Sequence, residues 1–556
     1  NRGKRILDLH AKARPAREGS PLVSPPELDS PRHRALARKV AEESVVLLKN
    51  ESAVLPLRSD GIRRIAVIGP NAAEARLGGG GSASVSAFHT VSLLEGIRTL
   101  LPESIEVLHA EGCSLDDGMT AIPAEALAPP GTAEFGAGLE GRYFKEEAFE
   151  RCHDPVMKKP DRTINFSWGW AAPGDGLPRI AFAIRWSGRI RFPVEGKIRM
   201  SLSTTESVAR VWIDGVLLLD CWSALDGANF EDRYTNRSGM AELDVRQGEA
   251  REILVEYKKT GTRAGVKLGW EIPGGDDPLK AAARLAASAD AAVVAGGLSN
   301  MFEGGMHDRE DFALPGKQRE LIEAVAEANP RTIVVLMNGT PVSMQGWSRR
   351  VPAIVEAFYP GQEGGTALAR ILFGKVNPSG RLPDTIPQSW SQVRSMDFYP
   401  GENGKVVYGE GLMVGYRHFD SAGLEPAWPF GFGLSYTNFK YEPPRLSSGR
   451  IGPGETVRVE AEVTNAGKVE GRDVVQVYLE PESPRSGQPA RELAAFVKLH
   501  LEAGERKTAA FHLRHDDFLG FDPGRGERLP RAASFRVRVG PHSREGGCVR
   551  IVVAES

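Results

Sequence analysis

The feature that most constrains the fold is a series of short apolar runs, each ending in a glycine or proline turn. The runs are DAAVVAGGLSN (290–300), RTIVVLMNG (331–339) and VPAIVEAFYPGQ (351–362), and between the first two lies LPGKQRELIEAVAEANP (314–330). The β-branched residues of the runs indicate buried strands, and the fourth segment has the apolar spacing of an amphipathic helix that Pro330 ends. Strands that alternate with helices form a parallel sheet with helices on both faces. We therefore predict an α/β/α sandwich.

The same pattern begins near the N-terminus. The segment HRALARKVAEESVVLLKN (33–50) has apolar residues near helical spacing, which predicts a helix. The next segment, RRIAVIGPNAAEARLGGGG (63–81), is typical of a buried strand that ends in a glycine and proline turn. The α/β domain is therefore predicted to consist of two separate stretches of the chain.

Two all-β regions are also predicted. The first contains LEGRYF (139–144), FAIRWSGRIRFPVEGKIRMSLS (182–203) and ARVWIDGVLLLDCW (209–222), with frequent glycine turns, and indicates a β-sandwich inserted into the α/β domain. In the second, TVRVEAEVT (456–464) places Val457, Val459, Ala461 and Val463 on one side of a strand. This C-terminal region is predicted to be an immunoglobulin-like or fibronectin-like sandwich.

The predicted chain is therefore an α/β and all-β multidomain protein, in which a β-sandwich interrupts an α/β/α sandwich and a second β-sandwich follows. The predicted boundaries are 1–32 for a basic, proline-rich leading segment, 33–138 and 274–392 for the two parts of the α/β domain, 139–273 for the insert, 393–429 for a linker and 430–556 for the C-terminal domain. A length of 556 residues agrees with three or four domains.

Composition excludes several classes of partner. The net charge of -2 provides no electrostatic field that would attract nucleic acid or an anionic membrane. No apolar run approaches the ~18 to 20 residues of a membrane span. Cys113, Cys152, Cys221 and Cys548 are scattered, with no CxxC spacing, so we expect ordinary thiols and no metal site. We expect neither nucleic acid nor a membrane as a partner.

The first residues suggest that the protein has more sequence upstream. The chain begins NRGKRILDLHAKARPAREGS, with no initiator Met and no apolar signal-peptide core. We therefore expect an upstream segment, and the sequence gives no indication of the compartment.

A cluster of carboxylates lies just past a predicted strand end, in MFEGGMHDRED (301–311). Ligand sites of parallel sheets gather at the carboxyl ends of strands, so this loop is a candidate site. A general acid needs partial burial, whereas a carboxylate beside an arginine stays ionised. Asp308 adjoins Arg309, but Glu303 follows Met301 and Phe302 and precedes two glycines. Glu303 is thus the candidate acid, with a solvated loop carboxylate as the alternative, and for His307 we expect a polar loop role.

The glycine-rich segment LGGGGSASVS (77–86) could be mistaken for a phosphate-binding loop. A P-loop requires Gly-Lys-Ser/Thr at the start of a helix, and a dinucleotide fingerprint requires GxGxxG directly after a strand. Neither pattern is present. We expect a flexible interdomain loop, and nucleotide binding remains the weakest of the functional alternatives.

Several segments together resemble glycoside hydrolase family 3, and most closely its β-glucosidases. In chain order they are IAVIGPNAAEARLGGGGSASV, DREDFALPGKQRELI, IVVLMNGTPV, AFYPGQEGGTALARILFGKVNPSGRLPDTIP, VGYRHFD and WPFGFGLSYTNF. They span roughly residues 65–440, and the C-terminal region is similar to the family's fibronectin type III-like domain. The insert resembles the protective-antigen-type β-sandwich that borders the substrate entrance in some of these enzymes.

The resemblance implies a catalytic role for Glu303. The family's acid/base lies in a motif commonly written Glu-Gly-Tyr-Asp-Arg, and Glu303-Gly304 with Asp308-Arg309 resembles its two ends, although two extra residues lie between them and the Tyr is absent. The nucleophilic Asp of the family belongs to an N-terminal (β/α)₈ barrel, and this chain has no matching Ser-Asp-Trp or Lys-His-Phe segment. RILDLHAKA within residues 1–32 resembles the end of that barrel.

The sequence thus predicts the C-terminal part of a retaining, exo-acting β-glucosidase, with Glu303 as general acid/base and without metal or cofactor. The expected partners are a β-glucoside or oligosaccharide and a barrel carrying the nucleophile, and a homo-oligomer is left open. Phe230 and Asp232 of the insert are candidate substrate-binding residues because they lie in an aromatic and acidic loop-like run. The alternatives are a noncatalytic carbohydrate-binding or scaffold protein and, as a substrate class, a β-xylosidase or broad-specificity β-glycosidase.

Overall fold

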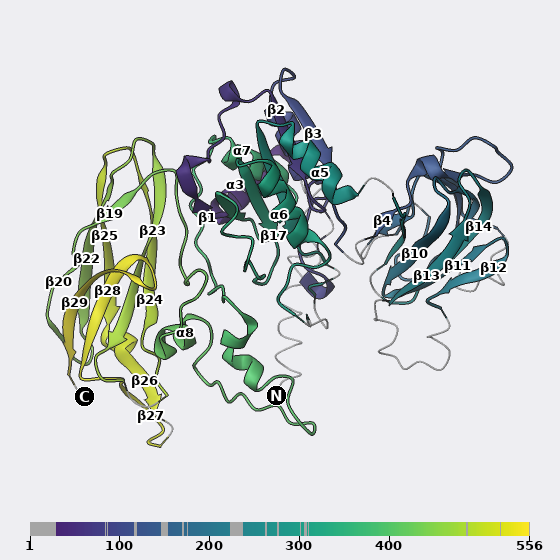
Figure 1. Cartoon of the computed structure of the whole chain (residues 1–556). Coiled ribbons are helices and arrows are strands. Elements are labelled where there is room, and N and C mark those ends of the chain that lie inside the picture. The colour runs from purple at the N-terminus through teal and green to yellow at the C-terminus, as the bar shows by residue number, and fades with distance from the viewer. Residues whose placement is uncertain are drawn as a thin grey trace, which may run out of the picture.

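A six-stranded sheet lies at the centre of the computed structural model (Figure 1), which describes residues 29–554 except 84, 86, 116–118, 146–153, 169–171, 175, 223–236, 262–263, 275–276, 301, 305–308, 310, 485–486 and 523. Its strands, in spatial order, are β1 (Val46–Asn50), β18 (Ala353–Glu356), β17 (Thr332–Met337), β16 (Ala291–Gly297), β2 (Arg64–Ile68) and β3 (Glu106–Ala110). The last five are parallel, and β1 runs antiparallel to β18. The apolar runs of the sequence thus form the predicted parallel sheet.

Helices cover both faces of this sheet, as predicted (Figure 1). One face packs against α4 (Leu93–Leu100) and α7 (Gly364–Leu372), and α3 (Pro31–Ser44) packs beside α7. The other face packs against α5 (Pro278–Ala287) and α6 (Gln318–Ala328). Alternate strand residues supply the two cores: Val293 lies in the first and Val294 in the second. The predicted α/β/α sandwich is confirmed.

The helix predicted over residues 33–50 is wrong in its second half. Helix α3 ends at Ser44, and residues 46–50 form β1 at the edge of the sheet. Leu36 and Val40, which suggested the apolar face of the helix, are 60% and 59% exposed. The run from Val46 to Leu48 is buried, so its side chains fill the cores of both faces better in a strand than on one side of a helix.

The insert is a sandwich of two antiparallel sheets around one apolar core. The first sheet has the order β13 (Arg237–Val245), β10 (Gly196–Thr205), β15 (Gly265–Glu271), β4 (Thr120–Ala121), and β8 (Asn165–Ser167) also pairs with β15. The second has the order β12 (Val216–Asp220), β11 (Ser207–Ile213), β14 (Ala250–Lys259), β9 (Ala183–Arg191), β6 (Leu139–Phe144), β7 (Met157–Asp161), and β5 (Leu127–Ala128) pairs with β9. Strands β4 and β5 precede residue 139, so the sandwich also recruits residues just before the predicted boundary.

The C-terminal region is a second sandwich, as predicted. One sheet contains β19 (Phe439–Tyr441), β22 (Thr456–Asn465), β20 (Arg445–Leu446) and β25 (Arg506–Arg514). The other contains β21 (Arg450–Ile451), β29 (Glu545–Val553), β28 (Ser534–His542), β23 (Gly471–Pro481) and β24 (Glu492–Leu501), and β26 (Leu519–Asp522) pairs with β27 (Glu527–Pro530) in a separate hairpin. Val457, Val459, Ala461 and Val463 are all buried in its core, which confirms the predicted alternation.

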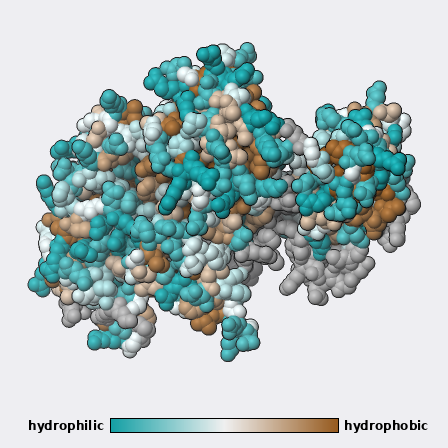
Figure 2. Space-filling model, in the orientation of Figure 1, coloured by the Kyte–Doolittle hydropathy of each residue, from teal (hydrophilic) through white to brown (hydrophobic). Residues whose placement is uncertain are grey.

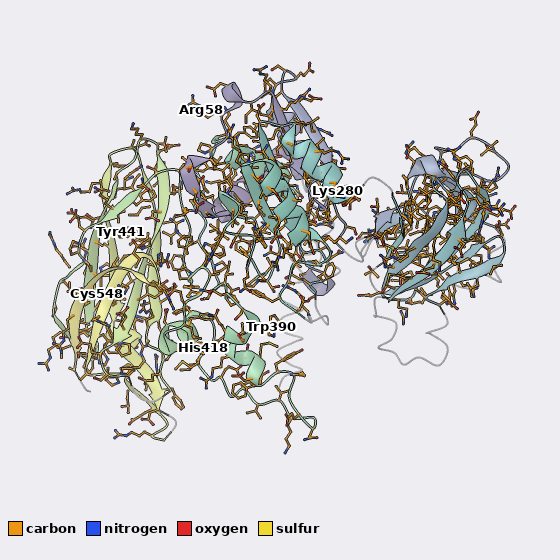
Figure 3. All side chains as sticks on the ribbon, viewed as in Figure 1. Arg58, Lys280, Trp390, His418, Tyr441 and Cys548 are labelled. Carbon is orange, nitrogen blue, oxygen red and sulfur yellow. The ribbon has the colours of Figure 1, made fainter. Side chains whose placement is uncertain are left out.

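An extended segment joins the α/β domain to this sandwich. It contains two short 3₁₀ turns, Trp390–Gln392 and Arg394–Asp397, and helix α8 (Tyr416–Ala422). Figure 3 places Trp390 and His418 on this segment, below the central sheet in that view. The face shown in Figure 2 is mainly hydrophilic, with apolar residues at the lower edge in the same region. Among the described residues, none of the helices has the length and apolarity to cross a membrane.

Candidate active site

Glu303 lies at the carboxyl end of β16, as predicted, but it is not a solvated loop residue. Glu303 is buried, with 7% of its surface exposed. The Glu303 N–H donates to the Ser299 carbonyl (3.2 Å), and the Glu303 carbonyl accepts from the Gly80 N–H (2.6 Å). The burial agrees with the candidate acid and not with the alternative of a solvated loop carboxylate.

The glycine-rich segment 77–86 lies beside this loop, where a flexible interdomain connection was expected. Gly80 and Gly304 form a parallel β-bridge. A Cβ atom on Gly304 would lie 2.9 Å from the Gly80 Cα, so only glycine allows the two backbones to approach this closely. The glycines thus serve the position of Glu303 rather than a phosphate.

Four hydrogen-bond donors surround the Glu303 carboxylate. The backbone N–H groups of Gly339 and Thr340 donate at 2.7 Å to Oε2 and Oε1, and the Tyr359 hydroxyl donates to Oε2 at 2.5 Å. The Thr340 hydroxyl also donates to Oε1. Donors of this kind stabilise the negative charge of a carboxylate. The site therefore holds a firmly oriented carboxylate whose two oxygens both accept hydrogen bonds.

The donors come from the ends of two neighbouring parallel strands. Gly339 and Thr340 follow β17, and Tyr359 follows β18. Phe358, just before Tyr359, has a φ of +51°, a left-handed conformation that is costly for an aromatic residue. Strain of this kind is typical of functional sites that the surrounding structure holds in place.

Two other ionisable side chains adjoin this carboxylate. Arg309 donates to the Thr340 hydroxyl (3.0 Å) and to the Pro341 carbonyl (3.0 Å), and burial lowers its pKa while the charge of Glu303 opposes the shift. Burial, followed by the charge of Glu303, raises the pKa of Tyr359, so the phenol remains a donor. The site combines a carboxylate, a phenol and a guanidinium.

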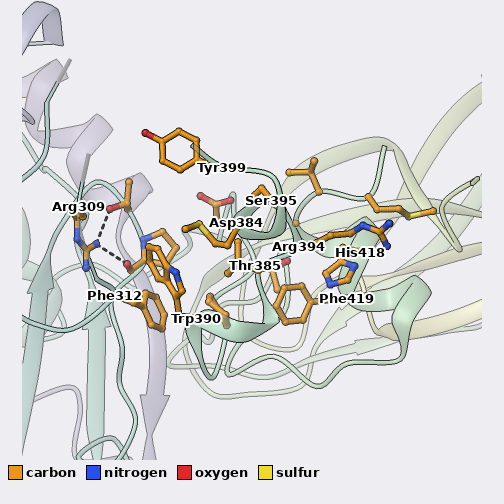
Figure 4. A pocket seen from close by; sticks show the side chains of 18 of the residues that line it. Arg309, Phe312, Asp384, Thr385, Trp390, Arg394, Ser395, Tyr399, His418 and Phe419 are labelled. Atoms are coloured by element: carbon orange, nitrogen blue, oxygen red, sulfur yellow. Dashed lines mark hydrogen bonds between the residues drawn. The ribbon is translucent and has the colours of Figure 1, made fainter. Parts of the chain in front are cut away.

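A cavity of about 560 Å³ opens beside Glu303 (Figure 4). Its walls come from the carboxylate loop and from the segment that leads to the C-terminal sandwich. The residues of the first wall include Phe302, Glu303, Arg309 and Phe312, and those of the second include Asp384, Trp390, Tyr399 and His418. The rings of Phe312 and Trp390 lie 6.0 Å apart, and burial raises the pKa of Asp384. Aromatic rings with a few polar groups are suited to bind a small organic molecule.

Several residues singled out from the sequence lie outside the described residues. These are Phe230 and Asp232 of the insert, and His307, Asp308 and Glu310 of the carboxylate loop. Asp311 is described, and its carboxylate accepts from the Ala313 N–H at 2.8 Å, as in a local turn. The structure thus leaves Glu303 as the predicted site residue whose surroundings it describes.

The described residues contain one cluster that could hold a metal ion. Glu470, His500 and Glu502 lie together on the C-terminal sandwich, partly or fully exposed. Cys113 and Cys221 are buried free thiols, Cys548 is an exposed one, and Cys152 lies outside the described residues. None of these groups belongs to the cavity beside Glu303.

Sequence reasoning missed Tyr359, Thr340, Asp384 and Trp390 as neighbours of Glu303 or its cavity. Thr340 and Tyr359 each lie three residues after a strand of the predicted parallel sheet, β17 and β18 respectively. The strand-end rule that selected Glu303 could therefore also have selected them. Asp384 and Trp390 lie in irregular chain, and no periodic pattern marks them.

Comparisons with known proteins agree with this arrangement. Residues 45–416 match the Glycosyl hydrolase family 3 C-terminal domain, and residues 473–543 match the Fibronectin type III-like domain. The Beta-glucosidase of Rhizobium radiobacter is 37% identical over 535 residues, which are 94% of this chain and 63% of that protein. Probable beta-glucosidase K of Emericella nidulans is 32% identical over 507 residues, 88% of this chain and 58% of that protein.

Solved structures are similar over most of the chain as well. The beta-glucosidase from Kluyveromyces marxianus in complex with glucose has a TM-score of 0.74 and 29% identity, over 95% of this chain and 62% of that one. DesR, a beta-glucosidase from Streptomyces venezuelae in complex with D-glucose, has a TM-score of 0.68 and 28% identity, over 96% of this chain and 62% of that one. The chain spans about three fifths of the length of the curated relatives and solved structures that it matches.

Proposed function

Because the chain belongs to glycoside hydrolase family 3, we propose that it is the C-terminal part of a retaining β-glucosidase that releases terminal non-reducing β-D-glucosyl residues. The observation that carries the proposal is the buried Glu303 carboxylate at the strand ends, beside a cavity of about 560 Å³. A carboxylate fixed at the edge of a binding cavity is what acid/base chemistry on a glycosidic bond requires.

Glu303 supplies one of the two carboxyl groups of a retaining mechanism. It protonates the glycosidic oxygen of the departing group and then takes a proton from the water that attacks the glycosyl-enzyme. The second carboxylate, about 5 to 5.5 Å away in retaining enzymes, forms the covalent intermediate. We assign that nucleophile to a barrel in the part of the relatives that this chain does not span.

The contacts of Glu303 bear most directly on the second half of this cycle. Four donors point at the carboxylate, and donors stabilise the negative charge that a general base carries before it activates water. For the first half, the carboxyl must carry a proton, so one oxygen has to exchange a donor for an acceptor. The Tyr359 hydroxyl is such a group, because it can rotate to accept.

The same four donors favour a second candidate role for Glu303. A carboxylate that accepts from the ends of β17 and β18 ties its loop to the sheet, as a structural anchor would. In that case the cavity would still bind the substrate, but a group other than Glu303 would transfer the proton. The two roles predict different kinetics.

The test compares Glu303→Gln and Glu303→Ala with the complete protein as parent. If Glu303 is the acid/base, E303Q loses far more rate on glucosides with poor leaving groups than on activated aryl glucosides, by about 10²-fold or more, because only the former need a proton. Azide should partly restore E303A by replacing the activated water. E327Q, at an exposed position, is the matched control.

Equal losses on both substrate classes without azide rescue would assign Glu303 to the anchor role. Thermal unfolding of the same variants separates the two further, since loss of an anchor lowers stability in both variants while loss of an acid/base need not. The chain alone is expected to fold but to show no measurable glucosidase activity, because we assign the nucleophile to a barrel outside it. Retaining cleavage by a preparation free of any barrel chain, as judged by mass spectrometry, would place the nucleophile within these 556 residues.

The candidate substrate residues of the insert belong to the same proposal. Phe230 and Asp232 would contact the aglycone, so F230A and D232N should change relative rates between short and long oligosaccharides more than they change the choice of sugar. Unchanged relative rates in both variants would remove the two residues from the substrate site.

A further inference from the structure

Glu356 is a buried carboxyl that the proposed mechanism does not use. It is the last residue of β18 and is 1% exposed. In the sheet it lies between Val46 of the antiparallel β1 and Leu336 of the parallel β17. Among the described residues it forms no ion pair with a lysine, arginine or histidine side chain, so no positive charge offsets the cost of burying a negative one.

Its two hydrogen bonds go to the two turns that supply the donors of Glu303. The Phe358 N–H donates to Oε1 of Glu356 at 2.9 Å, and the Asn338 amide donates to Oε2 at 3.2 Å. The same Asn338 amide also donates to the Thr340 carbonyl at 3.1 Å. Glu356 therefore contacts one residue in each turn. These are Asn338 in turn 338–340, which follows β17, and Phe358 in turn 356–359, which begins at the end of β18.

Each turn presents a hydroxyl to Glu303 and needs a fixed backbone to do so. Thr340 donates both its N–H and its hydroxyl, and Tyr359 donates its hydroxyl at 2.5 Å. Phe358, whose N–H donates to Glu356, has a φ of +51° and directly precedes Tyr359. A conformation of this cost persists only where neighbouring contacts impose it. The hydrogen bond to Glu356 is one such contact.

We propose that Glu356 is a positioning residue: it fixes the turns 338–340 and 356–359 so that Thr340 and Tyr359 meet the Glu303 carboxylate. The inference rests on the proposed function only for its kinetic consequence, since the geometry is present in this chain. Glu356 touches Phe358 and Asn338 rather than the cavity, and it acts on the site through them.

Burial favours the uncharged form of Glu356. Burial raises the pKa of Glu356 to about 8, the hydrogen bonds from Phe358 and Asn338 oppose the shift, and the negative charge of Glu303 adds to it. Glu303 is the charged group that acts on Glu356, since its other neighbours, Asn338, Phe358 and the backbones of β1 and β17, are neutral. Above a pH of about 8, Glu356 would ionise, and its negative charge would repel the negative charge of Glu303.

The experiment uses Glu356→Gln, Glu356→Ala and the control E327Q. Infrared difference spectroscopy of this chain at pH 7 should show a protonated carboxyl band that is lost in E356Q and kept in E327Q. In the complete protein, E356Q should lose less kcat than E356A at neutral pH, because its amide oxygen still accepts one of the two hydrogen bonds. It should also extend activity to higher pH, because Gln cannot ionise. E356A should lose about 10²-fold in kcat with a smaller change in KM, because the donors of Glu303 shift.

Each outcome decides one of the two claims. A missing carboxyl band would overturn the role of Glu356. So would an E356A variant with the kcat of the parent, or an E356Q variant whose activity falls at the same high pH as that of the parent. A band that behaves as expected, with a crystal structure of E356A in which Tyr359 has left Glu303, would support the role even if the complete protein cleaved no glucoside. Failure of the complete protein to cleave any glucoside would instead overturn the proposed function.

Discussion

At the scale of single residues, the buried carboxyl of Glu356 makes stability depend on pH. Its pKa is raised from 4.5 to about 8 in the folded chain, so folding binds a proton between these values. The stability that this group contributes is complete below pH 4.5 and is lost as the pH rises through about 8. At pH 7 the loss is of the order of 3 kcal/mol.

Glu356→Gln should therefore be more stable than its parent near pH 8 and similar or less stable at pH 4.5. The measurement is thermal unfolding of the isolated chain across this range, with Glu327→Gln as the control for a solvent-exposed Glu to Gln change. A difference between E356Q and parent that does not grow with pH would show that Glu356 is already ionised in the folded chain.

The sequence could select Glu303 but not its environment. Its position after a β-branched run and before two glycines was visible locally, and the strand-end rule gave its place in the sheet. Its donors lie 36 to 56 positions away, in Gly339, Thr340 and Tyr359, and depend on which strands are neighbours. The spatial order of β16, β17 and β18 is set by long-range packing, so the burial of Glu303 could not be read from composition around it.

At the scale of elements, helices α4 and α7 are packed so closely that glycine is required between them. A Cβ atom on Gly365 would lie 1.9 Å from the Ser92 carbonyl oxygen, and one on Gly96 would lie 2.1 Å from the Gly365 carbonyl oxygen. Gly365→Ala should cost about 3 kcal/mol or more, because backbone rather than a flexible side chain must move. Urea unfolding measures this.

The matched control for this glycine is Gly449→Ala. A Cβ atom at Gly449 would have nothing within 4 Å, so this change should be nearly neutral. If G365A and G449A had similar unfolding midpoints, α4 and α7 would have to be free to separate without cost, and the close packing would not contribute to stability.

A second element-scale prediction concerns the junction with the C-terminal sandwich. Asp473 of β23 is 1% exposed and accepts from Arg381, which lies before the linking segment, and from the Tyr441 hydroxyl at 2.6 Å. Arg381→Ala leaves this carboxylate buried without its cation, so we expect a loss of about 3 to 5 kcal/mol. Loss of the exposed pair Arg506 and Glu462 through R506A should cost at most about 1 kcal/mol.

Limited proteolysis distinguishes a local from a domain-level effect of R381A. Cleavage in the linking segment that releases an intact C-terminal sandwich is the expected result, because Arg381 joins two units with separate cores. Uniform digestion of the whole chain, or no change in cleavage, would contradict a role at the junction.

The helix expected over 33–50 shows why element boundaries are hard to predict here. Leu36 and Val40 suggested a continuous apolar face with Leu47 and Leu48, but the former are exposed and the latter are buried in a strand. The local pattern fits both states. The choice is made by β18, whose free edge pairs with β1, and that edge is invisible in the sequence of residues 33–50.

At the scale of the whole molecule, exposed apolar side chains gather on the segment that leads to the C-terminal sandwich. In the described part of the chain, seven of the large exposed apolar residues lie between positions 390 and 414: Trp390, Tyr399, Val406, Val407, Tyr408, Leu412 and Val414. Trp390, Tyr399 and Val414 also line the cavity beside Glu303. A concentration of this kind marks an interaction surface.

We propose the barrel as the occupant of this surface. The chain spans about three fifths of the length of its relatives, which leaves room for a barrel in the rest. Asp29, the first described residue, accepts a hydrogen bond from the Gln362 side chain at 3.4 Å. Gln362 follows β18, the strand whose end also presents Tyr359 to Glu303. A barrel joined to this chain before Asp29 would therefore be tethered near the strand ends that hold the site. Covering the segment would remove its apolar side chains from water.

Val407→Asp and Tyr408→Asp should weaken association with a separately produced N-terminal part of the protein by about tenfold or more, since each places a charge on apolar surface that the association would bury. Their residues are 65% and 79% exposed in this chain, so neither change should affect its own folding. Phe496→Asp is the matched control, at a residue that is 68% exposed on β24 of the C-terminal sandwich. Sedimentation velocity measures the association directly, without relying on catalysis. Equal affinity in all three variants would exclude the segment as the contact with the barrel. If the chain alone formed a homodimer that V407D abolished, the surface would instead bind a second copy of the chain.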